Sequence, residues 1–123
     1  MRRKLGSVRA EPSRLARTAA LGLKIKPMST YFVVNSTITD HEKLMEYQRA
    51  VGPTLAGHDV KVVAASNDAS PLEGTSAGAR MVIMEFPTRE ALLAWYNSDA
   101  YQNVIGLRFA ATEGFGMIVE GFK

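Results

Sequence analysis

Two neighbouring stretches organise this chain: Ala79–Phe86, ARMVIMEF, and Trp95–Arg108, WYNSDAYQNVIGLR. The first is an apolar run stopped by Pro87, which predicts a β-strand. In the second, the Ser98 hydroxyl can accept a hydrogen bond from a backbone amide two or three residues later. Ser98 therefore predicts the start of a helical segment, Asp99 to about Thr112.

The other strands and helices are predicted from the segments that flank these two stretches. The strand-like runs are rich in β-branched and aromatic residues, and the helix before the second strand carries apolar residues at spacings of three and four. We expect strands at Tyr31–Ile38, Val60–Ser66 and Phe115–Phe122, a helix that Thr39 caps and Gly57 ends, and a short helix that Thr88 caps. The order β-α-β-β-α-β predicts an α+β, ferredoxin-like fold with a four-stranded antiparallel sheet and both helices on one face.

The strands are apolar on both sides, whereas a sheet with one wet face alternates apolar and polar residues. In the strand Ala79–Phe86, Met81 and Ile83 lie on one side, and Val82 and Met84 lie on the other. Two helices cover only one face, and four strands of about six residues leave roughly 400 Å² of the other face uncovered. We therefore expect a homodimer that packs sheet against sheet, as an α+β barrel.

Length and composition are those of one globular domain. The chain has 123 residues, 46% apolar and 22% charged, and it has no cysteine, so disulfides, thiolate chemistry and cysteine-ligated metals are excluded. The two histidines, His41 and His58, lack the partner spacing of a metal site. No apolar run approaches the roughly 18 residues of a membrane span, and we expect a cytoplasmic protein without a cofactor.

Positive charge is concentrated at the N-terminus. Residues 1–27 carry eight Lys or Arg and one Glu, whereas residues 28–123 carry seven Lys or Arg and eleven Asp or Glu. Because the expected domain at 28–123 is acidic, the formal net charge of +3 does not indicate nucleic-acid binding. We interpret residues 1–27 as a disordered or non-native extension, and the alternatives are an organellar targeting segment or a segment that binds an anionic partner.

Arg108 is the polar side chain that most needs an explanation. Tyr101, Ile105 and Arg108 recur at spacings of four and three, so they share a helix face that is otherwise apolar and should turn toward the sheet. A buried cation is costly unless it is paired. Arg108 is therefore expected to pair with a strand acid, Glu85 or Glu120, or to lay its stem on apolar surface, or to anchor a ligand carboxylate or phenolate.

Four further side chains are candidates for a pocket or its chemistry. Trp95 and Tyr96 are adjacent, so one is expected in the core and the other at a rim, and a ligand-stacking wall is the alternative. Asn35 is polar in an apolar strand, and it either pairs with the backbone or offers a donor and an acceptor to a ligand. His58 lies at a turn and is either a surface residue or a weak candidate proton carrier.

Six short pieces spread over residues 30–122 resemble the corresponding segments of one known family. They are Leu72-Glu73-Gly74, Arg80–Pro87, Ala94–Ser98, Tyr101-Gln102, Leu107-Arg108 and Ile118–Gly121. The family is DUF1330 of the dimeric α+β barrel superfamily. The resemblance implies the ferredoxin-like fold and the dimer but no reaction, and this chain has Gly57-His58 where the family usually has Gly-Gly.

The same region is similar to the haem-degrading monooxygenases of that superfamily. Their pocket uses an Asn of the first strand and a Trp at the start of the last helix, and Asn35 and Trp95 stand at these places. The position of their axial His falls on Ile105, an aliphatic side chain that cannot bind iron. This departure weighs against haem degradation.

We expect the cleft between helices and sheet to bind a small apolar or anionic organic molecule. Arg108 would anchor it, Trp95, Tyr96 and Tyr101 would wall it, and Asn35 would orient it, because polar groups among apolar ones are the usual composition of a pocket. The alternatives are an enzyme of monooxygenase or isomerase type, cofactor-free or haem-linked, and a structural or interaction dimer without a ligand.

Overall fold

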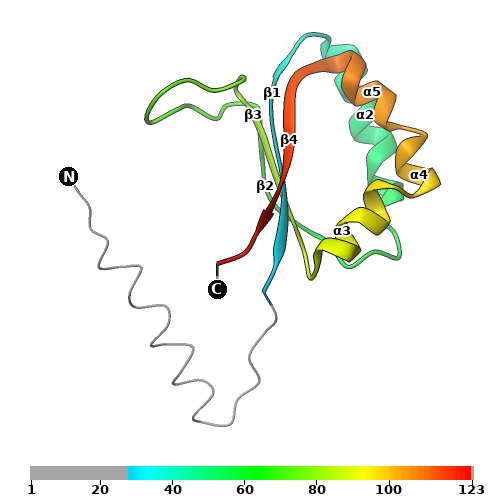
Figure 1. Ribbon diagram of the computed structural model, residues 1–123. Coiled ribbons are helices and arrows are strands. Elements are labelled where there is room, and N and C mark those ends of the chain that lie inside the picture. Colours follow the sequence, from blue (N-terminus) through cyan, green and yellow to red (C-terminus); the bar gives the residue numbers. More distant parts are fainter. Residues whose placement is uncertain (1–27, 123) are drawn as a thin grey trace, which may run out of the picture.

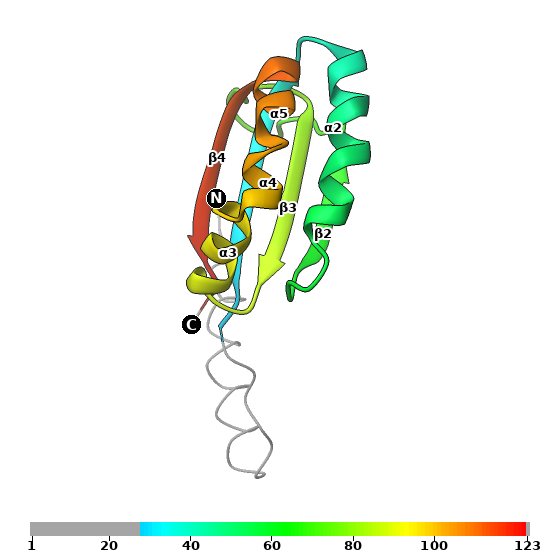
Figure 2. The ribbon, with the colours of Figure 1, turned by 90° about the vertical axis from the view of Figure 1, so that its right-hand side faces the viewer.

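Four antiparallel strands form one sheet, and the helices lie together on one face of it (Figures 1 and 2). The computed structural model describes residues 28–122, so the extension expected at 1–27 lies outside the described residues. The strands are β1 (Thr30–Ile38), β2 (Lys61–Ser66), β3 (Arg80–Phe86) and β4 (Thr112–Glu120), and the helices are α2 (His41–Thr54), α3 (Arg89–Tyr96), α4 (Asp99–Gln102) and α5 (Ile105–Ala111).

The strand order β2-β3-β1-β4 is that of the ferredoxin-like fold, which confirms the predicted fold class. In the register, Phe32 of β1 lies opposite Met84 of β3 and Ile118 of β4. Because side chains alternate across a strand, these residues and those two positions away point to the helices. No helix of the described chain has the length and apolar character needed to cross a bilayer.

The first helix begins one residue later than the sequence predicts. Asp40, not Thr39, is the N-cap: its side chain accepts a hydrogen bond of 3.0 Å from the Lys43 amide. The Thr39 amide instead donates to the Ala111 carbonyl at 2.8 Å, which ties the start of α2 to the end of α5. The predicted cap at Thr39 was therefore wrong, because a tertiary hydrogen bond uses the residue that local sequence favoured as the cap.

The segment from Asp99 to about Thr112 is two short helices and not one. Ser98 caps α4 as predicted, since its hydroxyl accepts from the Tyr101 amide at 3.2 Å. The chain then turns at Asn103 and Val104, two poor helix formers, before α5 begins at Ile105. The break matters for packing, because Tyr101, Ile105 and Ala111 are all buried in the same core.

The end of α2 also differs in detail. Pro53 lies within the last turn of α2, and the helix ends at Thr54 with Leu55 as its C-cap. Gly57, the predicted C-cap, lies just beyond and has a φ of 81°, which only glycine adopts without strain. Thr88 caps α3 as predicted, by accepting from the Ala91 amide at 3.0 Å.

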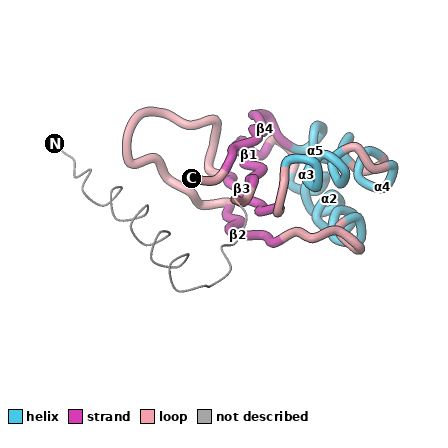
Figure 3. Tube along the Cα trace, turned by 60° about the horizontal axis from the view of Figure 1, so that its bottom comes forward, coloured by secondary structure: helices cyan, strands magenta, loops and turns pink. Residues whose placement is uncertain are grey.

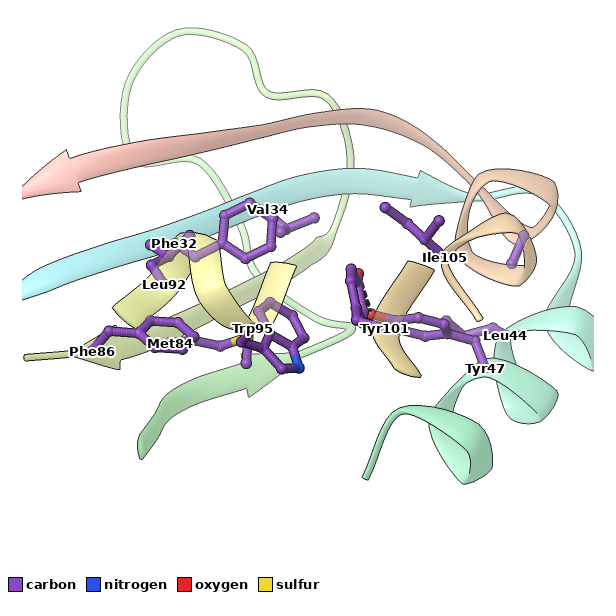
Figure 4. Close-up of a cluster of buried hydrophobic side chains, with 11 residues drawn as sticks. Phe32, Val34, Leu44, Tyr47, Met84, Phe86, Leu92, Trp95, Tyr101 and Ile105 are labelled. Atoms are coloured by element: carbon purple, nitrogen blue, oxygen red, sulfur yellow. Dashed lines mark hydrogen bonds between the residues drawn. The ribbon is translucent and has the colours of Figure 1, made fainter. Parts of the chain in front are cut away.

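An aromatic cluster forms the centre of the core (Figure 4). The ring centroids of Trp95 and Tyr101 lie 4.1 Å apart, and Trp95 also contacts the rings of Phe86 and Phe32 at 5.7 and 6.1 Å. The indole N–H donates to Thr54 Oγ1 at 3.0 Å, so the one polar atom of the buried indole is satisfied by α2. These contacts join α2, α3 and α4 to the sheet.

The face of the sheet away from the helices is apolar and open. Phe115, Met117 and Val119 of β4 are 49%, 55% and 43% exposed, and they point away from the helix layer. The loop between β2 and β3 projects from the sheet on this same side (Figures 1 and 3), and it carries Leu72, which is 97% exposed. The observed face matches the uncovered surface that the strand pattern predicted.

Replacing Leu92 with alanine should lower the free energy of unfolding by about 2–5 kcal/mol, because its side chain is 1% exposed and its loss leaves a cavity. Met45→Ala on the outer side of α2, where the side chain is 55% exposed, should change it by less than about 0.5 kcal/mol. Urea unfolding followed by circular dichroism measures both. Equal effects of the two substitutions would contradict the described core.

Candidate functional site

A cavity of about 200 Å³ lies between α2 and the helix-facing side of the sheet. Its walls are mostly apolar and come from α2, β1, β2 and β3, including Val34, Val51, Leu55, Val62, Ala65, Val82 and Met84. Five polar side chains with donor groups also line it: Ser36, Tyr47, Gln48, Arg80 and Arg108. An apolar cavity with a few convergent donors is the composition expected of a small-molecule site.

Arg80 opens β3 and is 9% exposed. Its Nη1 donates to Asn67 Oδ1 at 2.7 Å, and no carboxylate of residues 28–122 pairs with it. Burial lowers the pKa of Arg80, and the positive charge of Arg108 lowers this pKa further, while Tyr47 acts in the opposite direction. An arginine stays charged even so. The cavity therefore contains a cation whose only described hydrogen-bond partner is a neutral amide.

Ser36 lies directly opposite Arg80 in the β1–β3 register, and both side chains face the helices. Residues opposite each other on neighbouring antiparallel strands have Cβ atoms about 4.5–5.5 Å apart. Ser36 is 2% exposed, and its Oγ has no hydrogen-bond partner among the described residues. A buried hydroxyl without a partner costs about 1–3 kcal/mol, so this donor is available to a ligand in the cavity.

A chain of hydrogen bonds leads from Arg108 to the cavity. Nη1 of Arg108 donates to the Tyr101 hydroxyl at 3.1 Å, and the hydroxyls of Tyr101 and Tyr47 lie 2.8 Å apart (Figure 4). The Arg108 guanidinium also lies over the rings of Phe32 and Phe109, at 5.7 and 5.2 Å from their centroids. These contacts hold the head of Arg108 at the edge of the cavity.

The predicted ion pair between Arg108 and a strand acid is not formed. Glu120 pairs instead with Arg89 at 3.6 Å and accepts from Thr30 Oγ1 at 3.1 Å. Glu120 and Glu85 lie opposite Thr30 and Tyr31, at the end of β1 remote from Ser36 and the cavity cations. Strand register, which the sequence did not provide, therefore separates the acids from Arg108.

Tyr101 is fully buried, and burial raises the pKa of its hydroxyl well above the usual value of 10. The neighbouring Tyr47 hydroxyl raises this pKa further, while the charge of Arg108 lowers it. The phenol therefore stays protonated across the physiological range. It can accept from Arg108 and at the same time donate to Tyr47.

The other predicted site residues do not gather at the cavity. Asn35 faces away from the helices, where its amide donates to the carbonyls of Gly78 and Arg80 and its Oδ1 accepts from Ala77. It thus fastens the β2–β3 loop to β1. Trp95 is 0% exposed in the core. Neither side chain lines the cavity.

Tyr96 and His58 lie outside the cavity as well. Tyr96 is half-buried and lines two further pockets beside β4, of about 210 and 260 Å³, both of which also border Arg108. His58 follows α2, and its backbone amide donates to the Leu55 carbonyl at 3.1 Å. Of the five ligand-binding candidates, the structure brings only Arg108 to the cavity wall, with Tyr101 bonded behind it.

Sequence reasoning missed Ser36, Tyr47, Gln48 and Arg80 as site residues. The signal was present in the strand alternation, because Arg80 continues the series Val82 and Met84 that faces the helices. Ser36 continues the corresponding series of β1, and Tyr47 lies on the buried face of α2 together with Leu44. A cation on the inner face of a strand was therefore the readable sign of the site.

The arrangement places two guanidinium groups, two hydroxyls and the amide of Gln48 around a mostly apolar space, and guanidinium and hydroxyl groups are donors suited to an anion. Among residues 28–122, no three His, Cys, Asp or Glu side chains gather as metal ligands. Ile105, at the place of the axial ligand in the haem-degrading enzymes, is buried in the core.

Comparison with known proteins gives a family and a fold. The sequence matches the family described as "Domain of unknown function (DUF1330)" over residues 29–122. Two similar solved structures are the RPA0582 protein of unknown function from Rhodopseudomonas palustris and methylated RPA0582, each 17% identical with a TM-score of 0.66. They cover 90% of this chain, and the matches span 93% and 91% of their own chains. No curated protein matches the sequence.

Above pH 10, the buried phenol of Tyr101 should destabilise the protein. The unfolded chain then releases this proton while the folded chain keeps it, so the free energy of unfolding falls by up to about 1.4 kcal/mol per pH unit until the raised pKa is reached. Tyr101→Phe should remove this slope, and Tyr96→Phe should keep it. Urea unfolding of the three proteins at pH 9, 10 and 11 measures it, and a difference between wild type and Tyr101→Phe that is constant with pH would contradict the assignment.

Proposed function

The chain belongs to the DUF1330 family, and because that family is described only as a domain of unknown function, we propose a function from its cavity: it binds a small organic anion with an apolar body. The observation that carries this proposal is the pair of arginines, Arg80 and Arg108, on one mostly apolar cavity with no carboxylate of residues 28–122 paired to either.

Charge supports an anion over a neutral molecule. Removing a guanidinium from water costs several kcal/mol, and a structural role is usually accompanied by an acidic partner that repays this cost. Arg80 has Asn67 as its described partner, and Arg108 has a phenol and two aromatic faces. Both cations are thus positioned by neutral groups and keep donor capacity for an incoming anion.

Size supports a compact ligand. The volume of about 200 Å³ exceeds the roughly 150 Å³ of an engineered cavity that holds benzene, and it is below the roughly 300 Å³ at which drug-sized pockets begin. A single ring or a short branched chain with one charged group is the size class that this cavity accommodates.

Calorimetric titration tests the proposal with two pairs of probes: benzoate against benzamide, and hexanoate against hexanamide. Each acid should bind at least tenfold more tightly than its amide, because only the acid offers a charge-assisted contact. Arg108→Gln should weaken benzoate binding about tenfold, since it removes a charged donor that lines the cavity.

Arg89→Gln is the matched control, because it removes an exposed arginine whose partner is Glu120 and which lies away from the cavity. It should leave the affinity unchanged. Failure of both acids to bind, or equal binding of acid and amide, would refute an anion site.

We also propose that two copies pack through the open face of their sheets. Phe115, Met117 and Val119 lie there half-exposed, alongside Val33 and Ile83 on the same face. An uncovered apolar face of roughly 400 Å² is within the range that marks interaction sites. A second copy offers the same shape and apolar character, which suits a symmetric interface.

Light scattering coupled to size exclusion should give a mass of twice 13.4 kDa at micromolar concentration. Met117→Glu should shift the protein to the monomer, because it places a charge in the apolar contact. Met45→Glu on α2, at a methionine of the same 55% exposure, should remain dimeric. A stable wild-type monomer, or two variants with the same mass, would refute this interface.

A further inference from the structure

We propose that the ligand is a monocarboxylic acid, and that Arg80, Ser36 and Tyr47 together hold its carboxylate. This inference rests on the anion-binding function proposed above, and it specifies the head group of the ligand and the residues that bind that group. Each of the three side chains lines the same cavity.

The ligand needs to carry a single negative charge, because only the positive charge of Arg80 is left uncompensated in the cavity. Arg80 is buried at 9% exposure, whereas Arg108 is only half-buried and lies against the faces of Phe32 and Phe109. Water and aromatic faces therefore compensate part of the charge of Arg108, while that of Arg80 is left to the ligand. A carboxylate carries one charge, while a phosphate group carries about −1.5 to −2 at neutral pH.

Arg80 and Ser36 present adjacent donors. They lie opposite each other on β1 and β3 with both side chains on the cavity side. Arg80 has five N–H groups, of which the bond to Asn67 uses one, and the hydroxyl of Ser36 has no described partner. A planar carboxylate accepts two parallel bonds from a guanidinium and has further lone pairs for a hydroxyl, so it satisfies both groups at once.

The Tyr47 hydroxyl is the third donor, and the direction of the hydrogen bonds between Arg108, Tyr101 and Tyr47 makes it available. The Tyr101 oxygen accepts from Arg108, and the other described partner of the Tyr101 hydroxyl is the Tyr47 oxygen at 2.8 Å. If Tyr101 donates to Tyr47, the proton of the fully buried Tyr101 hydroxyl is satisfied and the Tyr47 proton is free to point into the cavity. Such chains polarise one another and strengthen the last donor. Tyr101 is thus a positioning residue, and Tyr47 contacts the ligand.

Apolar side chains beside this head-group site form a surface for the body of the acid. Val51 of α2 and its C-cap residue Leu55 face Val62 and Met84 of the sheet across the cavity. The volume of about 200 Å³ has room for one ring or a short branched chain next to the carboxylate. Benzoate therefore has the charge, planarity and size that the cavity selects.

Calorimetric titration of the full chain with benzoate, benzamide and phenylphosphonate tests the head-group class. Benzoate should bind, and the neutral amide and the more highly charged phosphonate should each bind at least tenfold more weakly. Phenylphosphonate binding as tightly as benzoate would overturn the carboxylate assignment, although an anion site would remain.

Variants test the three donors. Ser36→Ala and Tyr47→Phe should each weaken benzoate binding about fivefold, the effect of one lost hydrogen bond. Tyr101→Phe should weaken it similarly although Tyr101 does not line the cavity. Tyr96→Phe is the control, because its ring contacts Tyr101 at 5.6 Å while its hydroxyl is outside the chain of bonds.

The double variant Tyr47→Phe/Tyr101→Phe separates positioning from packing. If Tyr101 acts only through Tyr47, the double variant should bind benzoate no more weakly than Tyr47→Phe alone, whereas independent packing effects would multiply. Thermal denaturation of each variant shows whether it is folded.

The carboxylate assignment fails, and the proposed anion site stands, if benzoate binds and Arg108→Gln weakens its binding while Ser36→Ala and Tyr101→Phe do not. Both fail if benzoate does not bind to wild type.

Discussion

The contact between the Trp95 indole and the Tyr101 ring, at a centroid distance of 4.1 Å, determines how the helix layer is assembled. Trp95 belongs to α3 and donates to Thr54 at the end of α2, while Tyr101 belongs to α4 and meets Tyr47 in the middle of α2. The two aromatic side chains thus fix α2 at two points. Because α2 forms one wall of the cavity, they also set the width of the cavity and the direction of the Tyr47 hydroxyl.

The same packing leaves the buried positive charge of Arg80 without a carboxylate partner among residues 28–122. Arg80 is buried on the inner face of the sheet beside an unpartnered serine, and its described partner is the neutral side chain of Asn67. Interiors usually pair such a cation with an acid or replace it with an apolar side chain. The small anion that we propose for the cavity would supply a partner, and it would explain a cation and a hydroxyl where the alternation of β1 and β3 calls for apolar residues.

Much of the fold could be predicted from the sequence, because strand runs, turn residues and capping positions are local signals. The apolar character of both sheet faces was readable as well, and the exposed Phe115 and Met117 agree with it. The break between α4 and α5 and the displaced cap at Asp40 were not readable, since a long-range hydrogen bond from Thr39 to Ala111 and the burial of Ile105 decide them.

Asn35 was selected as polar in an apolar strand, but the alternation of side chains places it on the face away from the helices, where it fastens a loop. The candidate site was predictable only in its location and in Arg108, because Ser36 and Arg80 become a pair through the register of β1 against β3.

The most direct measurement is a crystal structure of the protein grown with 4-bromobenzoate, in which anomalous scattering from bromine locates the ligand. We predict bromine between Val51 and Met84, and the carboxylate within hydrogen-bond distance of Arg80, Ser36 and Tyr47. A cavity filled by protein side chains, with Arg80 turned to an acidic partner and bromine elsewhere, would contradict it.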